Sequence, residues 1–298
     1  MTGEPRPTGK RGQPDDPQVV GGTSAARIGV ANTEARNPRA AKLEALNTRE
    51  LLELMNDEDA TVPAAVNRAI PEIARATDAI VAAFAKGGRL RYVGAGTSGR
   101  LGVLDASEAP PTFGVEPELV HGMIAGGDEA LRRSIEGAED DALAGARETR
   151  EHVRASDVLV GISASGRAPY VVGGLEGGEN VASKTVAITC DPSSPLARAA
   201  DIGIVVEVGP EVLAGSSRLK AGTATKLVLN MLSTTAMIRS GRTRGDLMID
   251  LRATNAKLRD RAVRIVRELA GVDEREARSR LEASGWSVRA ALEADRQR

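Results

Sequence analysis

This chain of 298 residues has few aromatic side chains and a single cysteine. Two Phe, two Tyr and one Trp are too few for the stacked aromatic platforms that bind single-stranded nucleic acid. One cysteine, Cys190, excludes an internal disulfide framework and suits a reducing compartment, so we expect a cytoplasmic protein. Cys190 ends the apolar run KTVAITC, and we predict that it packs in the core.

An excess of charge of one sign and long apolar runs are also lacking. The formal net charge is −1, so bulk electrostatic attraction to nucleic acid or to an acidic membrane is not expected. No apolar run reaches the roughly 18 residues that suggest a transmembrane helix. The two histidines, His121 and His152, are far apart in the sequence and lack companion ligands. We therefore expect no histidine-based metal site.

The order of the apolar periods predicts an α/β fold. Two helical stretches, 39–59 and 61–88, precede five short apolar runs: RLRYVGAG, LVHGMIAGG, SDVLVGISASG, KTVAITC and DIGIVVEVG. Apolar strands that alternate with helices indicate a parallel sheet covered on both faces. We predict a five-stranded parallel sheet sandwiched by helices, of the flavodoxin or Rossmann kind.

The two ends of the chain depart from this pattern. Residues 1–30 are rich in Pro, Gly and charge and lack an apolar signal core, which predicts a disordered extension. A long helix is predicted within 216–241, and three or four short helices follow it, with breaks at AGVDE and ASGW. We predict a catalytic domain over 31–248 and a small helical bundle over 249–298, which either packs on that domain or binds a partner.

Three hydroxyl-rich turns precede predicted helices. In YVGAGTSGR a strand ends in glycines, and Thr97 and Ser98 open the next helix, where backbone amides suit an oxyanion such as phosphate. VLVGISASGR follows the third strand, and GSSRLKAG opens the long helix. Ligands of open parallel sheets bind beyond the carboxyl ends of strands. The candidate binding residues of the second and third turns are Ser163, Ser165, Gly166, Arg167, Ser216, Ser217, Arg218 and Lys220.

The first turn is not a standard nucleotide motif. It lacks the lysine of a Walker A loop. Gly94, Gly96 and Gly99 meet the spacing G-x-G-x-x-G, but no acidic residue closes the second strand, where a ribose would be bound. A compact sugar phosphate suits the turn better than a dinucleotide.

Carboxylates stand close to these turns. LDASEAPP places Glu108 just before two prolines, where we expect the helix to end. RRSIEGAEDD places Glu136 and Glu139 after the second strand. On a helix the two would share one face, as in a solvated acidic surface or in a site. The residues alone leave both interpretations open.

Several long segments resemble one known family. YVGAGTSGRLGVLDASEAPPTFG, IAGG with IEGAED, GISASGRAPYV and GSSRLKAGTATKLVLNMLSTTAMIRSG together are similar to the N-acetylmuramic acid 6-phosphate etherases, of the sugar isomerase (SIS) superfamily. The similarity begins at TEARNP and is looser over the last helices. It implies hydrolysis of the ether between C3 of the sugar and D-lactate, giving N-acetylglucosamine 6-phosphate in cell-wall recycling. It also implies that no metal or organic cofactor takes part and that the protein is a homodimer.

The resemblance also implies roles for individual residues. Glu108, in D-A-S-E, is expected to protonate the leaving oxygen, and Glu139, in E-G-A-E-D, is expected to be the second catalytic glutamate. The expected substrate-binding set combines the family positions with the turns described above: Thr97, Ser98, Glu136, Ser163, Ser165, Gly166, Arg167, Ser217 and Lys220.

The place of Glu108 raises a problem of distance. An unbroken helix from Ser98 to Glu108 would separate them by about 15 Å along its axis. Either the helix breaks near Asp105, or Glu108 serves the pocket of a neighbouring subunit, which we favour.

Two other functions remain open at this point. The glucokinase regulatory protein resembles the same family, so a non-catalytic sugar-phosphate sensor is one alternative. An aldose–ketose isomerase also begins with removal of the C2 proton, and it is the other. The intact D-A-S-E motif favours the etherase, and release of lactate separates the three.

Overall fold

A computed structural model describes residues 1–3, 32–251, 253 and 255–293. The extension predicted over 1–30 lies outside the described residues apart from its first three. Within those ranges no helix has the length and apolar character needed to cross a bilayer. The elements are η1 (Asn32–Glu34), η2 (Pro38–Ala40), η3 (Leu43–Ala45), α1 (Thr48–Asp59), α2 (Val62–Arg68), α3 (Ile70–Ala85), β1 (Leu90–Gly94), α4 (Gly96–Phe113), β2 (Val120–Ile124), η4 (Asp128–Leu131), η5 (Ala138–Asp140), α5 (Ala142–His152), β3 (Val158–Ile162), α6 (Pro169–Gly178), β4 (Lys184–Thr189), α7 (Pro195–Ala199), β5 (Ile202–Val205), α8 (Lys220–Arg239), β6 (Thr243–Arg244), β7 (Leu247–Met248), α9 (Ala256–Ala270), α10 (Glu274–Ala283) and α11 (Val288–Glu293).

The five predicted strands form one parallel sheet, which confirms the predicted fold class. The strand order is β2-β1-β3-β4-β5, so β1 lies between β2 and β3. Gly94, the last residue of β1, is in register with Ile124 of β2 and with Ile162 of β3. The carboxyl ends of these three strands therefore lie side by side.

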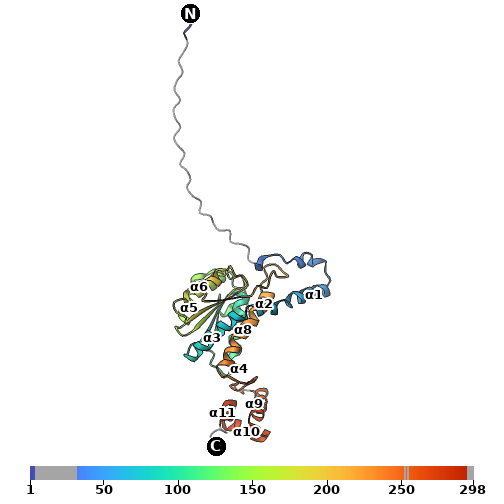
Figure 1. The fold of residues 1–298 in the computed structure, drawn as a ribbon, viewed down its shortest axis with the longest axis vertical. Coiled ribbons are helices and arrows are strands. Elements are labelled where there is room, and N and C mark those ends of the chain that lie inside the picture. The colour runs from blue at the N-terminus through green and yellow to red at the C-terminus, as the bar shows by residue number, and fades with distance from the viewer. Residues whose placement is uncertain (4–31, 252, 254, 294–298) are drawn as a thin grey trace. The chain divides into compact units, whose positions relative to one another are not determined.

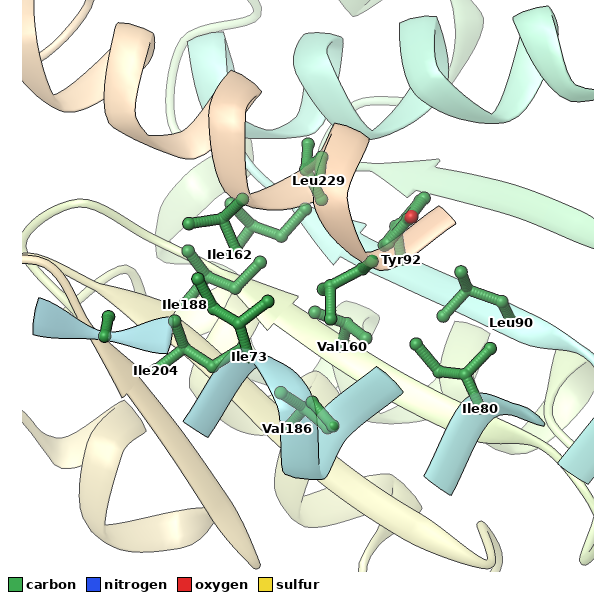
Figure 2. Packing of buried hydrophobic residues seen from close by; sticks show 14 of the residues in the cluster. Ile73, Ile80, Leu90, Tyr92, Val160, Ile162, Val186, Ile188, Ile204 and Leu229 are labelled. Carbon is green, nitrogen blue, oxygen red and sulfur yellow. The ribbon is translucent and has the colours of Figure 1, made fainter. Parts of the chain in front are cut away.

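Successive strand residues pack against opposite helical layers, as the two-residue repeat of a strand requires. Tyr92, Val160 and Val186 belong to a cluster with residues of α2, α3, α4 and α8, whereas their neighbours Val93, Leu159 and Ala187 pack with α5, α6 and α7. Figure 1 shows these helices on the two sides of the sheet. In Figure 2, Ile73 and Ile80 of α3 and Leu229 of α8 lie against the strand residues of the first cluster.

Glycines bring α5 and α6 into close contact on the second face. A Cβ atom at Gly145 of α5 would lie 1.9 Å from the carbonyl oxygen of Tyr170, and one at Gly173 would lie 2.3 Å from that of Ala142. Real Cβ atoms do not approach backbone oxygens so closely, so neither position accepts a larger residue without moving a helix. This contact fixes α6, whose first turn follows directly on the 163–167 loop.

The N-terminal helices are shorter than predicted. The stretch expected to be helical from residue 39 begins with the short turns η2 and η3, and α1 starts only after Asn47. Asn47 and Glu50 form a capping box, which fixes that start. The second stretch divides into α2 and α3 at Ala69, two residues before Pro71, which cannot donate a helical hydrogen bond.

The prediction that the helix ends at Glu108 is wrong. α4 continues through Pro110 and Pro111 to Phe113, and Gly114 closes it at φ +62° with an N–H bond to the carbonyl of Pro110. Ala109 and Phe113 are buried in the core, which holds this last turn in place although the prolines lack donors. An early break near Asp105 is therefore excluded as well.

Three helices, α9 to α11, follow the short β6–β7 hairpin, with breaks where AGVDE and ASGW predict them. They pack around a cluster of their own, which includes Ile249, Val266 and Leu281. The boundary at residues 248 and 249 stays a prediction.

The close contact of α5 with α6 makes a prediction about stability. Gly145→Ala should lower the free energy of unfolding by about 1–3 kcal/mol, because the methyl group meets backbone that cannot move alone. Gly203→Ala is the matched control, since its Cβ would lie 3.6 Å from the nearest atom, an ordinary contact. Urea denaturation measures both, and equal effects of the two variants would contradict the close packing.

Candidate active site

The first two hydroxyl-rich turns meet at the point where the strand order reverses. β1 continues through α4 on one face of the sheet to β2, and β3 continues through α6 on the other face to β4. Because β1 and β3 are parallel neighbours, the turns 95–98 and 163–167 leave adjacent strand ends in different directions. Such a switch point opens a crevice where α/β proteins bind ligands.

The first turn leaves the start of α4 open. Its N-cap residue is Ala95, and no described side chain caps this end. A Cβ at Gly94 would lie 2.6 Å from the amide nitrogen of Gly99, so only glycine allows the helix to start this close to the strand. Thr97 and Ser98 lie in the first turn and are partly exposed. Amide donors and two hydroxyl groups are thus available to an anion.

The second turn is tightly folded by its own serines. The Ser163 Oγ accepts a hydrogen bond of 3.1 Å from the Gly166 amide, and the Ser165 Oγ accepts one of 3.2 Å from the Arg167 amide. Gly166 has φ +63°, and a Cβ there would lie 2.3 Å from the Ser194 Oγ. The position therefore needs glycine for its backbone angle and for its space.

Asp191, which follows β4, orients Arg167 and was missed in the sequence. Its Oδ2 accepts a hydrogen bond of 2.9 Å from the Arg167 guanidinium. Burial alone would raise the pKa of Asp191, but hydrogen bonds from Ser193 and Arg167 outweigh it and hold that pKa below its usual value. An acidic residue directly after a predicted strand, in ITCD, was the available signal.

The third turn lies beside the first, but its lysine is not open to a ligand. A Cβ at Gly222 would lie 3.7 Å from both the Ser217 carbonyl oxygen and the Thr97 Cγ2, so the two turns are close neighbours. The Lys220 ammonium is buried and bonds to Glu58 Oε2 at 2.6 Å. This ammonium therefore already has an internal carboxylate partner, and the predicted part of Lys220 in substrate binding stays a prediction.

Glu211 occupies the start of α8. Its carboxylate accepts hydrogen bonds of 3.0 Å from the amides of Lys220 and Ala221, and its side chain is fully buried. Burial raises the pKa of Glu211, and the two amides partly offset that effect. A carboxylate of the protein thus fills the anion site of this helix. Of these two neighbouring helix starts, only the one at α4 has no capping side chain among the described residues.

Two of the predicted acids line one cavity with the start of α4. Glu136, Glu139, Gly96 and Arg100 are among the residues around a cavity of about 370 Å³. Glu136 and Glu139 do not share the face of a helix, because Gly137 between them has φ +74° and only the short η5 follows it. The loop is held instead by Arg100, which donates hydrogen bonds to the carbonyls of Leu131 and Arg133.

Glu108 lines a different cavity. This space of about 410 Å³ lies between α4, α8 and the β6–β7 hairpin, and Asp105, Asn230 and Ser233 also line it. Glu108 is exposed and makes no hydrogen bond or ion pair with any residue that the structure describes. The structure therefore does not bring the two predicted catalytic glutamates together within one chain.

Asp105, one turn before Glu108, is the hub of a buried polar network. Its carboxylate accepts hydrogen bonds from Tyr92 Oη at 2.8 Å and from Asn230 Nδ2 and Ser233 Oγ at 3.0 Å. Burial raises the pKa of Asp105, and the three donors partly offset that effect. No local sequence pattern indicates this network, because its donors come from a strand and from a distant helix.

Neither the cysteine nor the two histidines line the two cavities described above. Cys190 is buried, as predicted, and burial raises the pKa of its thiol to about 12. His121 and His152, distant in the sequence, lie with ring centroids 6.3 Å apart. The described residues contain no cluster of three His, Cys, Asp or Glu side chains placed to hold a metal ion.

The internal ion pair of Lys220 leads to a stability prediction. Lys220→Met should destabilise the fold, but by less than the roughly 3–5 kcal/mol expected for an unpaired buried charge. Glu58 loses its ammonium partner but keeps Arg39 and Asn37. The double variant Lys220→Met with Glu58→Gln should regain most of that loss. Urea denaturation compares the three proteins. Unchanged stability in the single variant, together with weaker sugar-phosphate binding, would instead support a direct role for Lys220 in binding.

Comparison with known proteins places the chain in a family. A family model of the glucokinase regulatory protein N-terminal SIS domain matches residues 72–178, and one of the SIS domain matches residues 141–235. Among solved structures, a phosphoheptose isomerase from Francisella tularensis is 18% identical, with a TM-score of 0.47, and the match covers 63% of this chain and 98% of that chain.

Relatives with much higher identity share one name. An N-acetylmuramic acid 6-phosphate etherase from Aeromonas hydrophila is 57% identical over 79% of this chain and 80% of its own length. One from Gloeobacter violaceus is 56% identical over 87% of this chain and 85% of its own. One from Vibrio parahaemolyticus is 52% identical over 87% of each. With identities this high over most of both sequences, the chain belongs to the N-acetylmuramic acid 6-phosphate etherase family.

Proposed function

We propose that this chain hydrolyses the D-lactyl ether of N-acetylmuramic acid 6-phosphate to N-acetylglucosamine 6-phosphate and D-lactate, as an enzyme of cell-wall amino-sugar recycling. The observation that carries the proposal is the identity of 52–57% to etherases over most of the chain. The open helix start at the switch point and the exposed carboxylates beside it support the same reaction. The buried, reduced cysteine suits the cytoplasm, where we place this reaction.

The chemistry needs one base and one acid. An unactivated ether resists attack by water at neutral pH, but opening the sugar ring exposes an aldehyde, which acidifies the proton at C2. A carboxylate removes that proton, the C3–O bond breaks, and a carboxylic acid protonates the departing lactyl oxygen. Water then adds to the resulting double bond. We assign the base to Glu139 and the acid to Glu108, each expected to contribute about 10²–10⁴-fold to the rate.

The phosphate group is assigned to the switch point. The amides and hydroxyl groups of Thr97 and Ser98 would donate to it from the start of α4, with Ser163, Ser165, Gly166 and Arg167 on the neighbouring turn. Arg167 is already oriented by Asp191, which reduces the entropy lost on binding. Glu136 and Glu139 line the cavity that Gly96 also lines, so a sugar held there would meet the base. Ser217 completes the site from the third turn.

The acid would come from a second copy of the chain. α4 is unbroken between Ser98 and Glu108, which separates them by about 15 Å along the helix axis. The two proposed catalytic glutamates also line different cavities. Glu139 lines one together with Gly96, and Glu108 lines another together with residues of α8. In a homodimer, Glu108 of one protomer would complete the pocket of its partner.

Replacing each of the two glutamates should block a different step of the reaction. Glu108→Gln should release no detectable D-lactate but still bind the substrate and exchange its C2 proton in deuterated water. Glu139→Gln should lose both lactate release and exchange, because the base is missing. An enzymatic lactate assay and proton NMR on the same samples measure the two steps.

Lactate release within a few-fold of wild type in Glu108→Gln, or undiminished exchange in Glu139→Gln, would refute the respective assignment. Sugar-phosphate interconversion without lactate would indicate an isomerase, and binding without any turnover a sensor.

The shared site predicts complementation between two inactive proteins. Glu108→Gln is mixed with the double variant Ser98→Ala and Ser163→Ala, which lacks two of the proposed phosphate donors. In a mixed dimer one pocket receives both defects, and the other receives intact donors and an intact glutamate. After random exchange half of the dimers are mixed, so about a quarter of wild-type activity should return. Differently tagged chains report whether subunits exchange. Complete exchange without any return of activity would show that Glu108 acts within its own chain.

A further inference from the structure

Glu108 is held in place by its backbone more weakly than a residue in the middle of a helix usually is. Pro110 and Pro111 lie within α4, and neither has an N–H to donate. The carbonyls of Ala106 and Ser107, which flank Glu108 on its N-terminal side, therefore lack their usual helical partners. The side chain of Glu108 makes no hydrogen bond or ion pair with the described residues either. Core packing of Ala109 and Phe113 holds the end of α4, so a further hold on the Glu108 turn must come from its N-terminal side.

Asp105 supplies such a fixed point three residues before Glu108. It is 8% exposed, and each of its oxygens is bonded. Oδ2 accepts from Tyr92 of β1, and Oδ1 accepts from Asn230 and Ser233 of α8. One carboxylate thus ties α4 both to the central sheet and to the long helix. Tyr92 lies in the core layer that Figure 2 shows, with its hydroxyl oxygen in red.

Asp105 and the proposed acid Glu108 lie next to the same cavity. Asp105 and Glu108 both line the cavity of about 410 Å³ beside α8, together with Asn230 and Ser233. Residues three apart on a helix are surface neighbours. A shift of the Asp105 turn would therefore be passed directly to Glu108, whereas the cavity that contains Glu139 lies at the other end of α4.

We propose that Asp105 is a positioning residue for Glu108, and that its hydrogen bonds to Tyr92, Asn230 and Ser233 aim the acid at the leaving oxygen. This role rests on the proposed function. It predicts a selective defect, because loss of the anchor should slow protonation of the lactyl oxygen but leave substrate binding and C2 proton removal intact. A residue that only stabilised the fold would slow both steps together.

The two tyrosines of the chain give a matched test. Tyr92 and Tyr170 are both 1% exposed, and the Tyr92 hydroxyl donates to Asp105 while the Tyr170 hydroxyl donates to Glu148. Tyr92→Phe and Tyr170→Phe thus remove the same atom from the core, but only the first change touches the anchor. Lactate release and C2 exchange into remaining substrate are measured for both variants and for wild type, with thermal melting as a check on folding.

Asp105→Ala and Asp105→Asn extend the series. Asp105→Ala should lower the ratio of lactate release to exchange by about 10²-fold, the loss expected when a catalytic group is misplaced by about 1 Å. Asp105→Asn keeps one acceptor for Asn230 and Ser233 and should restore part of that ratio. Tyr92→Phe should lower the ratio several-fold, and Tyr170→Phe should leave it at the wild-type value.

The outcomes separate the proposal from its foundation. If Tyr92→Phe and Asp105→Asn reduce release and exchange in equal proportion, or leave both unchanged, Asp105 does not position Glu108. If Asp105→Ala fails to fold, the matched tyrosine pair still decides the question. Absence of lactate from the wild-type protein would overturn the proposed function itself, and with it the role of Asp105.

Discussion

The site depends on one constraint, the parallel pairing of β1 with β3 while their following helices cover opposite faces of the sheet. Gly94 and Ile162 are in register, so the two chains diverge from the same edge. The divergence leaves backbone amides and hydroxyl groups around a crevice that no side chain of the sheet needs to fill. Gly99 and Gly166 then allow the turns to bend close to their neighbours. The phosphate position that we propose, near Glu139, rests on this topology.

Charge within the protein decides which helix start remains free. α4 and α8 begin beside one another, and each presents amides with partial positive charge. At α8 the buried carboxylate of Glu211 already accepts from two of them. Lys220, from the same turn, is neutralised by Glu58, whose pKa stays below its usual value because hydrogen bonds from Lys220 and Asn37 outweigh the effect of burial. These internal pairs leave the anion-binding capacity at α4.

Sequence patterns were sufficient for the five strands and for the carboxyl edge of the sheet, to which we assign the site. Five apolar runs became five strands, since a strand buried on both faces must be apolar throughout. Local sequence patterns were not sufficient where the end of a helix or the partner of a side chain depends on residues distant in the sequence. Core packing of Phe113 carries α4 past two prolines, and Glu58, 162 residues away, takes the ammonium of Lys220. The partners of Asp105 could not be found in this way either, because Asn230 lies 125 residues from it.

If Glu108 is the acid and Glu139 the base, as we propose, their separation has a physical consequence for association. Glu108, Glu136 and Glu139 are all exposed in the single chain. Charge that develops in a transition state is stabilised most effectively where water is excluded and donors are fixed in advance. An exposed carboxyl on an open surface meets neither condition, whereas the same carboxyl pressed against the pocket of a second copy meets both. In the dimer that we propose, the contact that supplies the acid would thus also remove the water. Both effects would depend on the partner because α4 is unbroken and carries Glu108 away from the start of its own helix.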